Sequence, residues 1–147
     1  MTVQEMGGLP VHNFSKGQLP DATPIGGDYM REVTLKRGGE GKPAHACMSG
    51  CVIQCSNAFA DEQGKLLAAP VEFETIGLCG SNLEIADLDG IAKINRLCND
   101  FGMDTIETGA TLGVMMDAAE QDKLPEGINR DDIPRFGDGE SGWKVLR

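Results

Sequence analysis

Apolar residues recur at helical spacing in the stretch that follows residue 87. Asp87 is a residue type that caps helix starts, and Gly102 is one that ends helices. The apolar positions between them lie three or four residues apart, as on one face of a helix: Leu88, Ile91, Ile94, Leu97, Cys98 and Phe101. The pattern predicts an amphipathic helix over residues 88–101, with the Cys98 thiol packed on its apolar face.

A second helix is predicted directly after the first. Asp104 or Thr105 can cap its start, and Pro125 lies beyond its end as a stop. Its expected core face consists of apolar residues four apart: Ile106, Ala110, Val114 and Ala118. Gly109 and Gly113 add a strip of small residues where another backbone could approach closely.

In residues 1–46 the apolar positions repeat neither every 2 residues, as in a strand, nor every 3.6, as in a helix. This segment also holds four of the seven prolines. A polar, glycine-containing centre between two apolar arms over residues 59–67 predicts a small β-hairpin. We therefore expect a mainly α fold, an irregular helical domain with a long Gly/Pro-rich N-terminal segment. The expected divisions are an irregular lead-in over 1–46, a helical domain over 47–140, and a C-terminal end over 141–147 that looks cut off.

Composition narrows the class of protein. The chain has 147 residues, 40% of them hydrophobic and 24% charged, which is the balance of a globular domain. Its net charge is −10 without a basic cluster, so a nucleic-acid partner is not expected. The sequence shows no apolar run long enough for a membrane span and no export signal at its start. We expect a cytoplasmic protein without a membrane partner.

Three of the five cysteines follow one another at equal intervals, as Cys47-x3-Cys51-x3-Cys55. Thiolates are preferred ligands of iron–sulfur clusters and of zinc. Zinc sites usually add paired C-x2-C motifs or further histidines, and His45 has no histidine partner downstream. The triplet therefore favours an iron–sulfur cluster, while the alternative is three small buried thiols. Cys79 is either a core thiol or a stand-in fourth ligand.

Several segments, taken together, resemble the tungsten-containing aldehyde ferredoxin oxidoreductase family. The resembling segments are LPVHNF (9–14), HACMSGCVIQC (45–55), EFETI (72–76), GSNL (80–83) and NRLCNDFGMDTIETG (95–109). The resemblance covers roughly residues 9–140. It implies one part, the middle domain, of a larger three-domain enzyme whose helical domains enclose a tungsten (or molybdenum) bis-pterin beside a [4Fe-4S] cluster.

The same resemblance implies roles for individual residues. Cys51 and Cys55 match the cluster ligands in register, whereas Cys47 sits one residue early, and the family's fourth cysteine would come from an absent domain. The family's pterin-binding segment corresponds here to three residues: Asn99, Met103 and Asp104. A carboxylate can accept hydrogen bonds from pterin N–H groups, although Asp104 could instead be only a helix cap.

Glu74 matches the family's active-site glutamate in position, where burial near the metal would raise its pKa toward the working pH. Glu72 is the competing candidate, and either could be a solvated strand residue. The resemblance thus implies a fragment or subunit of an enzyme that oxidises aldehydes to carboxylic acids and passes electrons to ferredoxin. Its partners would be the missing N- and C-terminal domains or subunits, and the isolated chain would be inactive. The alternatives are a small autonomous iron–sulfur electron carrier and a metal-free helical interaction module.

Overall fold

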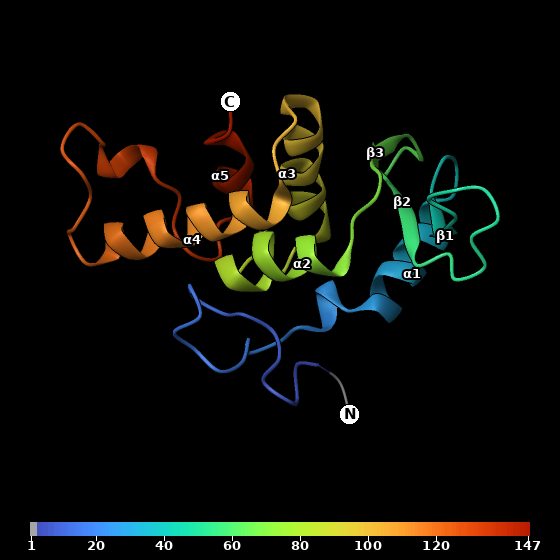
Figure 1. Cartoon of the computed structure of the whole chain (residues 1–147), viewed down its shortest axis with the longest axis horizontal. Helices are drawn as coiled ribbons and strands as arrows, with labels where there is room; N and C mark the ends of the chain where they lie inside the picture. Colours follow the sequence, from blue (N-terminus) through green and yellow to red (C-terminus); the bar gives the residue numbers. More distant parts are fainter. Residues whose placement is uncertain (1–2) are drawn as a thin grey trace.

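Two helices that lie side by side and a third that crosses them form the body of the chain, and a small sheet lies at one end of it (Figure 1). The computed structural model describes residues 3–147. In chain order the elements are η1 (Thr23–Ile25), α1 (Gly27–Arg37), β1 (Lys42–His45), β2 (Ser56–Ala60), β3 (Leu66–Ala68), α2 (Phe73–Cys79), η2 (Ser81–Leu83), α3 (Leu88–Phe101), α4 (Thr105–Glu120), η3 (Arg130–Asp132) and α5 (Gly139–Lys144).

Helix α3 confirms the strongest prediction except at Phe101, which was expected on the apolar face and is 58% exposed in the last turn. The Asp87 carboxylate accepts hydrogen bonds from the backbone N–H groups of Asp89 and Gly90, at 3.1 and 2.9 Å. Gly102 ends the helix in the left-handed conformation, with φ of 68°. The apolar side of α3 supplies much of the core, and Cys98 is fully buried there. This helix is therefore defined by its own sequence, through its caps and its single apolar stripe.

Helix α4 begins and ends as predicted, but its expected core face is wrong. Ile106 and Val114 are exposed, and the alanines between and after them are only half-buried. The buried residues lie on the opposite side of the helix: Gly109, Leu112, Gly113, Met116 and Ala119.

The glycine strip explains which face of α4 is buried. A Cβ at position 109 would lie 2.5 Å from the carbonyl carbon of Leu78 in α2. At position 113 it would lie 2.7 Å from Nδ2 of Asn82. Because the α2 backbone runs this close to α4, only glycine fits at position 109, and at position 113 a larger residue would have to displace the Asn82 side chain. The predicted close backbone approach is confirmed at Gly109, whereas the neighbours of Gly113 are side chains, and the face that carries both glycines is buried in place of the Ile106 face.

The lead-in is irregular apart from the short elements that precede residue 46, and residues 1 and 2 of it lie outside the described range. Helix α1 was not predicted, because its side chains are mostly polar and show no apolar stripe. It is attached at its end by Arg37, which donates to both carboxylate oxygens of Asp89 in α3, at 2.8 and 2.6 Å. Arg37 also donates to the carbonyl of Ala60 at 2.9 Å, so one side chain links α1, α3 and β2.

The sheet is antiparallel in the order β1-β2-β3. The connection between β2 and β3 is the predicted hairpin, in which Asp61 accepts hydrogen bonds from the backbone of Gln63 and Lys65. A longer loop, residues 46–55, joins β1 to β2 and projects from the end of the molecule (Figure 1). Among residues 3–147, none of the helices combines the length and the apolar character needed to cross a bilayer.

Candidate functional site

The cysteine triplet lies on the projecting loop, which we call the cysteine loop and define as residues 46–55. Cys47 and Cys55 are exposed and Cys51 is half-buried. The backbone N–H groups of Gln54 and Ile53 donate to the Cys51 sulfur and lower the pKa of this thiol below its ordinary value, and Cys47 contributes a smaller effect. The loop thus favours the thiolate form at its central cysteine, which is the form that binds metal.

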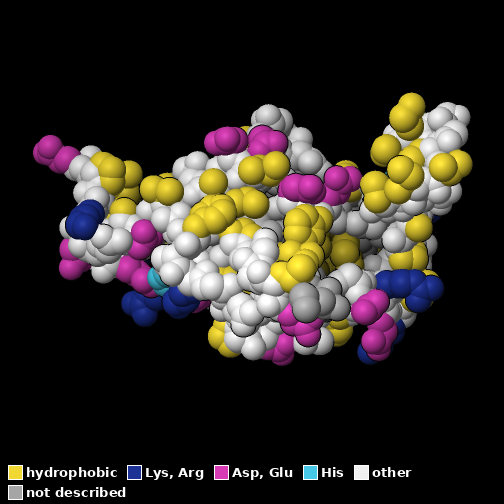
Figure 2. Space-filling view, turned by 60° about the horizontal axis from the view of Figure 1, so that its bottom comes forward, with side chains coloured by type: hydrophobic (Ala, Val, Ile, Leu, Met, Phe, Trp, Pro, Cys, Tyr) yellow, Lys and Arg dark blue, Asp and Glu magenta, His cyan; other side chains and the backbone are white. Residues whose placement is uncertain are grey.

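Apolar side chains surround these thiols on the surface. Met48, Val52 and Ile53 are all strongly exposed. Figure 2 shows hydrophobic side chains gathered on the projection at the right, the side on which the cysteine loop lies in Figure 1. The donor set fits an iron–sulfur cluster in its chemistry, because N–H donors to the ligand sulfurs are a recurrent feature of such sites. Within residues 3–147, however, no three His, Cys, Asp or Glu side chains are gathered closely enough to hold a metal ion.

Cys79 lies among α4 residues in the helical body and not with the triplet. Its thiol is completely buried and donates to the carbonyl of Thr105 at 3.2 Å. Burial is the main cause that raises the pKa of Cys79 to about 12, with a smaller contribution from nearby Cys98. A thiol held neutral in the core is a poor metal ligand, so the structure favours the core role for Cys79.

The two candidate glutamates lie at the start of α2. Glu72 occupies the N-cap position and Glu74 lies in the first turn, and both side chains are exposed. Neither is on a strand, which corrects that alternative. Glu74 was expected to be buried, but residues 3–147 leave its side chain exposed. Further polypeptide would be needed to enclose it beside a metal.

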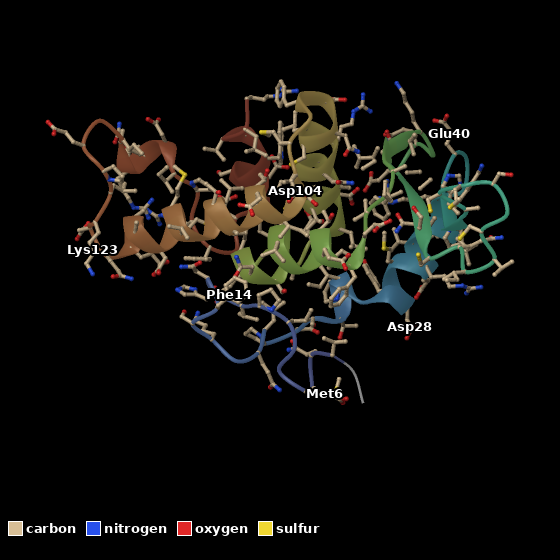
Figure 3. The ribbon with its side chains drawn as sticks, viewed as in Figure 1. Met6, Phe14, Asp28, Glu40, Asp104 and Lys123 are labelled. Atoms are coloured by element: carbon tan, nitrogen blue, oxygen red, sulfur yellow. The ribbon has the colours of Figure 1, made fainter. Side chains whose placement is uncertain are left out.

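The three residues of the pterin-like segment lie at the corner between α3 and α4. Asn99 is in the last turn of α3, and its Nδ2 donates to the carbonyl of Ala69 at 3.4 Å. Asp104 caps α4, with Oδ1 accepting from the backbone N–H of Glu107 at 2.8 Å (Figure 3). Met103 is exposed between them. The cap uses only Oδ1 as an acceptor. Oδ2 accepts no hydrogen bond within the described chain, so Asp104 can cap α4 and still accept a hydrogen bond from a ligand.

The packing of α2 on α4 brings Glu74 and Asp104 to the same end of the body. The hydroxyl oxygens of Thr75 and Thr105, the residues that follow them, are 2.9 Å apart. The later contact between Leu78 and Gly109 shows that the two helices run in the same direction. Two parallel helix N-termini concentrate unpaired backbone N–H groups, an environment that favours negative charge. The corner therefore combines a glutamate, an aspartate and N–H donors on one exposed edge.

A histidine that the sequence pattern did not single out as a site residue connects distant segments. The His12 ring nitrogens lie 3.2 Å from a Glu84 carboxylate oxygen and 3.3 Å from one of Glu120. The ring also stacks on Phe136, with 3.9 Å between ring centroids. One side chain thus joins the lead-in, α4 and the C-terminal segment. No local signal identifies it, because each partner is at least 70 residues away in the sequence.

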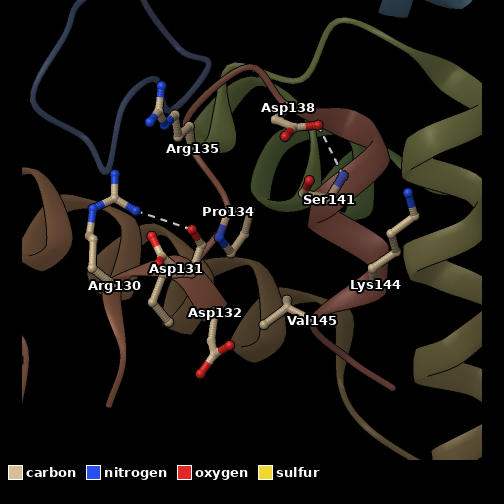
Figure 4. A pocket seen from close by; sticks show the side chains of 10 residues that line it. Arg130, Asp131, Asp132, Pro134, Arg135, Asp138, Ser141, Lys144 and Val145 are labelled. Atoms are coloured by element: carbon tan, nitrogen blue, oxygen red, sulfur yellow. Dashed lines mark hydrogen bonds between the residues drawn. The ribbon is translucent and has the colours of Figure 1, made fainter.

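A hollow lies elsewhere, between η3 and α5 (Figure 4). It has a volume of about 560 Å³ and is lined by both charged and apolar side chains. Its walls are held by short local bonds: Arg130 donates to the carbonyl of Ile133 at 3.1 Å, and Asp138 accepts from the backbone of Ser141 at 3.0 Å. None of the predicted site residues lines it.

The sequence matches one known protein family over its whole given length. The profile described as "Aldehyde ferredoxin oxidoreductase, domains 2 & 3" matches residues 1–147. The chain therefore belongs to the aldehyde ferredoxin oxidoreductase family.

Curated relatives in this family include three proteins, each named tungsten-containing aldehyde ferredoxin oxidoreductase. The chain is 33% identical over 125 residues to that of Pyrococcus furiosus, covering 84% of this chain and 19% of the relative. It is 32% identical to those of Thermococcus kodakarensis and Pyrococcus horikoshii, covering 94% of this chain and 22% of each relative. The chain thus spans about a fifth of the length of the relatives that it matches.

Proposed function

We propose that this chain forms part of an oxidoreductase that converts aldehydes to carboxylic acids and passes the electrons to ferredoxin through a [4Fe-4S] cluster. The observation that carries the proposal is the match of the entire chain to domains 2 and 3 of the family, with the cysteine triplet and the pterin-like segment both within it. A tungsten (or molybdenum) bis-pterin would supply the two-electron chemistry. The residues of this chain would bind and orient it and move a proton.

Each residue has a defined task in this proposal. Cys47, Cys51 and Cys55 would ligate the cluster, with the fourth ligand supplied from outside residues 3–147. Asp104 would offer its unengaged Oδ2 to N–H groups of the pterin, and Asn99 would add an amide acceptor. The contacts that this chain makes to the cluster and the pterin would thus lie within residues 47–140.

Glu74 would hold or release a proton at its carboxylate once the remaining polypeptide encloses it. A carboxyl group enclosed near a charged centre is a usable general acid or base, because burial brings its pKa toward the working pH. In the described chain Glu74 is exposed, so this role depends on assembly. We accordingly expect no aldehyde oxidation by the isolated chain.

The cluster is tested first, by anaerobic reconstitution of the chain with iron and sulfide. Cys51→Ser should abolish the iron content and the sulfur-to-iron absorbance. Cys79→Ser is the matched control and should leave both unchanged, because the Cys79 thiol lies in the core. Equal iron content in all three triplet variants would show that the thiols are not ligands. A cluster lost equally in Cys79→Ser would instead support the autonomous carrier, which needs that thiol as its fourth ligand.

The catalytic role is tested by Glu74→Gln in the assembled enzyme, with Glu72→Gln as the control. The amide keeps the size of the side chain but cannot exchange the proton. General acid–base contributions are about 10²- to 10⁴-fold, so we expect a loss in that range with iron and tungsten contents unchanged. A loss below roughly threefold would assign the proton transfer to another group.

A further inference from the structure

Helix α4 has apolar residues on two opposite sides, and the chain covers only one of them. The inner side packs on α2 and η2 through Gly109 and Gly113. The outer side carries what we call the outer stripe, defined by residues four apart: Ile106, Ala110, Val114 and Ala118. Val114 is 57% exposed, Ile106 is also exposed, and the two alanines are half-buried.

The charge pattern of α4 is that of an interior helix. Between Glu107 and Asp117 the sequence TGATLGVMM holds nine residues without a charge, although 24% of the chain is charged. Helix α1 shows the contrast, because it carries two acidic and three basic residues within eleven positions. A helix that is apolar all round belongs in the interior of a larger structure.

We infer that the outer stripe of α4 docks onto polypeptide from the part of the enzyme that lies outside this chain. The chain spans 19–22% of the relatives' length, so most of a family enzyme remains to cover it. The occupant presents an apolar surface, since burying Ile106 and Val114 without apolar contacts would gain nothing. Its rim carries Lys or Arg beside Glu107, because α4 has no basic residue of its own.

This inference rests on the proposed function only for the identity of the occupant as the rest of the same enzyme. The stripe begins two residues after Asp104, so the docked polypeptide would run directly onto the corner that holds Glu74, Asn99 and Asp104. Docking there would cover the α4 side of this corner, next to Asp104. The docking surface and the candidate site would thus adjoin each other.

The experiment compares Val114→Asp with Leu35→Asp, a matched control in α1 whose native side chain is 54% exposed. Each 147-residue variant is co-expressed anaerobically with the polypeptides encoded beside it that match the rest of the relatives' length. Affinity copurification and light scattering give the amount of 1:1 assembly. Circular dichroism of the isolated variants checks the fold, which neither exposed substitution should alter. Val114→Ala, a truncation without charge, gives a second measure if the aspartate variant fails to fold.

We expect Val114→Asp to weaken assembly at least 100-fold, since a charge would be buried without a partner, and Val114→Ala to weaken it several-fold. Leu35→Asp should assemble like the wild type. Unchanged assembly of Val114→Asp, or no assembly of the wild-type chain, would overturn the inference. Concentration-dependent dimers of the isolated chain that Val114→Asp abolishes would overturn it in favour of a second copy. An assembly that forms but lacks aldehyde oxidation would contradict the proposed function and leave the docking surface standing.

Discussion

The cysteine thiols of the helical body and those of the cysteine loop differ in burial and in the direction of their pKa shifts. In the body, Cys79 and Cys98 are fully buried, and burial raises the pKa of both thiols. In the loop, Cys47 and Cys55 are exposed, and backbone N–H groups lower the pKa of Cys51. The body keeps its thiols neutral as core residues, whereas the loop favours a thiolate and leaves it accessible. Residues of one type are therefore separated into structural and ligand-like roles by their surroundings.

The comparison also predicts where the chain tolerates substitution. The body is a packed assembly in which α2, α3 and α4 exclude water and constrain each residue by its neighbours. The cysteine loop has few neighbours, so its residues should be limited by what they bind and not by folding. The following substitutions compare the two regions, and unfolding by urea with circular dichroism gives the free energy in each case.

The largest effect is expected at the α2–α4 contact. Gly109→Ala would place a Cβ 2.5 Å from the Leu78 carbonyl carbon, and backbone cannot move aside as a flexible side chain could. We expect a loss of about 3 kcal/mol or more in the free energy of unfolding. Gly50→Ala in the cysteine loop meets no atom within 4 Å and only the strain of φ +81°, so it should cost about 1 kcal/mol. Similar costs at the two positions would contradict the tight contact.

Arg37 is expected to show the next largest effect. It bonds Asp89 through both carboxylate oxygens and also bonds the Ala60 carbonyl, and its side chain is mostly buried. Arg37→Ala should lower the free energy of unfolding by about 2–3 kcal/mol, because Asp89 and the carbonyl lose their donor. Arg96 is the control, since its bonds to Asp100 lie at the surface. Arg96→Ala should change stability by less than about 0.5 kcal/mol.

The accuracy of prediction differed between the two main helices for a physical reason. Helix α3 has one apolar stripe and strong caps, so periodicity alone identified its buried face. Helix α4 has two possible faces, one apolar at Ile106 and Val114 and one small at Gly109 and Gly113. Both faces show the spacing of a helix face, so the sequence pattern does not distinguish them. The position of α2 determines which face is buried. Helix α1 gave no periodic signal, since its attachment depends on the long-range pair of Arg37 with Asp89.

The candidate site was predictable in its residue types but not in its geometry. The spacing of the three thiols and the segment ending at Asp104 could be recognised directly from the sequence. That Asp104 would cap α4 with a single oxygen, and that Glu74 would lie at the same end through the Thr75–Thr105 contact, depends on helix packing. The exclusion of Cys79 from the triplet likewise follows only from its burial beneath α4.

A smaller effect is expected from the titration of Cys79. Its pKa is raised to about 12 in the folded chain, against 9.0 for the ordinary thiol. The unfolded chain therefore loses this proton first, and the stability contribution is complete below pH 9 and lost as pH rises from 9 to about 12. Between pH 8 and pH 10 the loss should be about 1.4 kcal/mol.

The measurement for Cys79 is a pair of urea titrations at pH 8 and pH 10. Cys79→Ser removes the titrating thiol but keeps a hydroxyl donor for the Thr105 carbonyl, so its stability should fall less between the two pH values. The difference between wild type and variant cancels the titration of lysines and of Tyr29, which both proteins share. Identical slopes in the two proteins would mean that the Cys79 thiol is as accessible as the thiols of the loop.

The smallest effect is expected at the apolar residues of the cysteine loop. Val52 is 91% exposed, so Val52→Ser removes almost no buried apolar surface and should change the free energy of unfolding by less than about 0.5 kcal/mol. Val71, which leads into α2, is the matched control at 1% exposure, and Val71→Ser should cost about 3 kcal/mol through lost burial and an unpaired hydroxyl. If Val52→Ser were as costly as Val71→Ser, the loop would be packed in solution and its thiols would be core residues. A neutral Val52→Ser that nevertheless reduced the iron content after reconstitution would show that the exposed apolar side chains shield a cluster and not the fold.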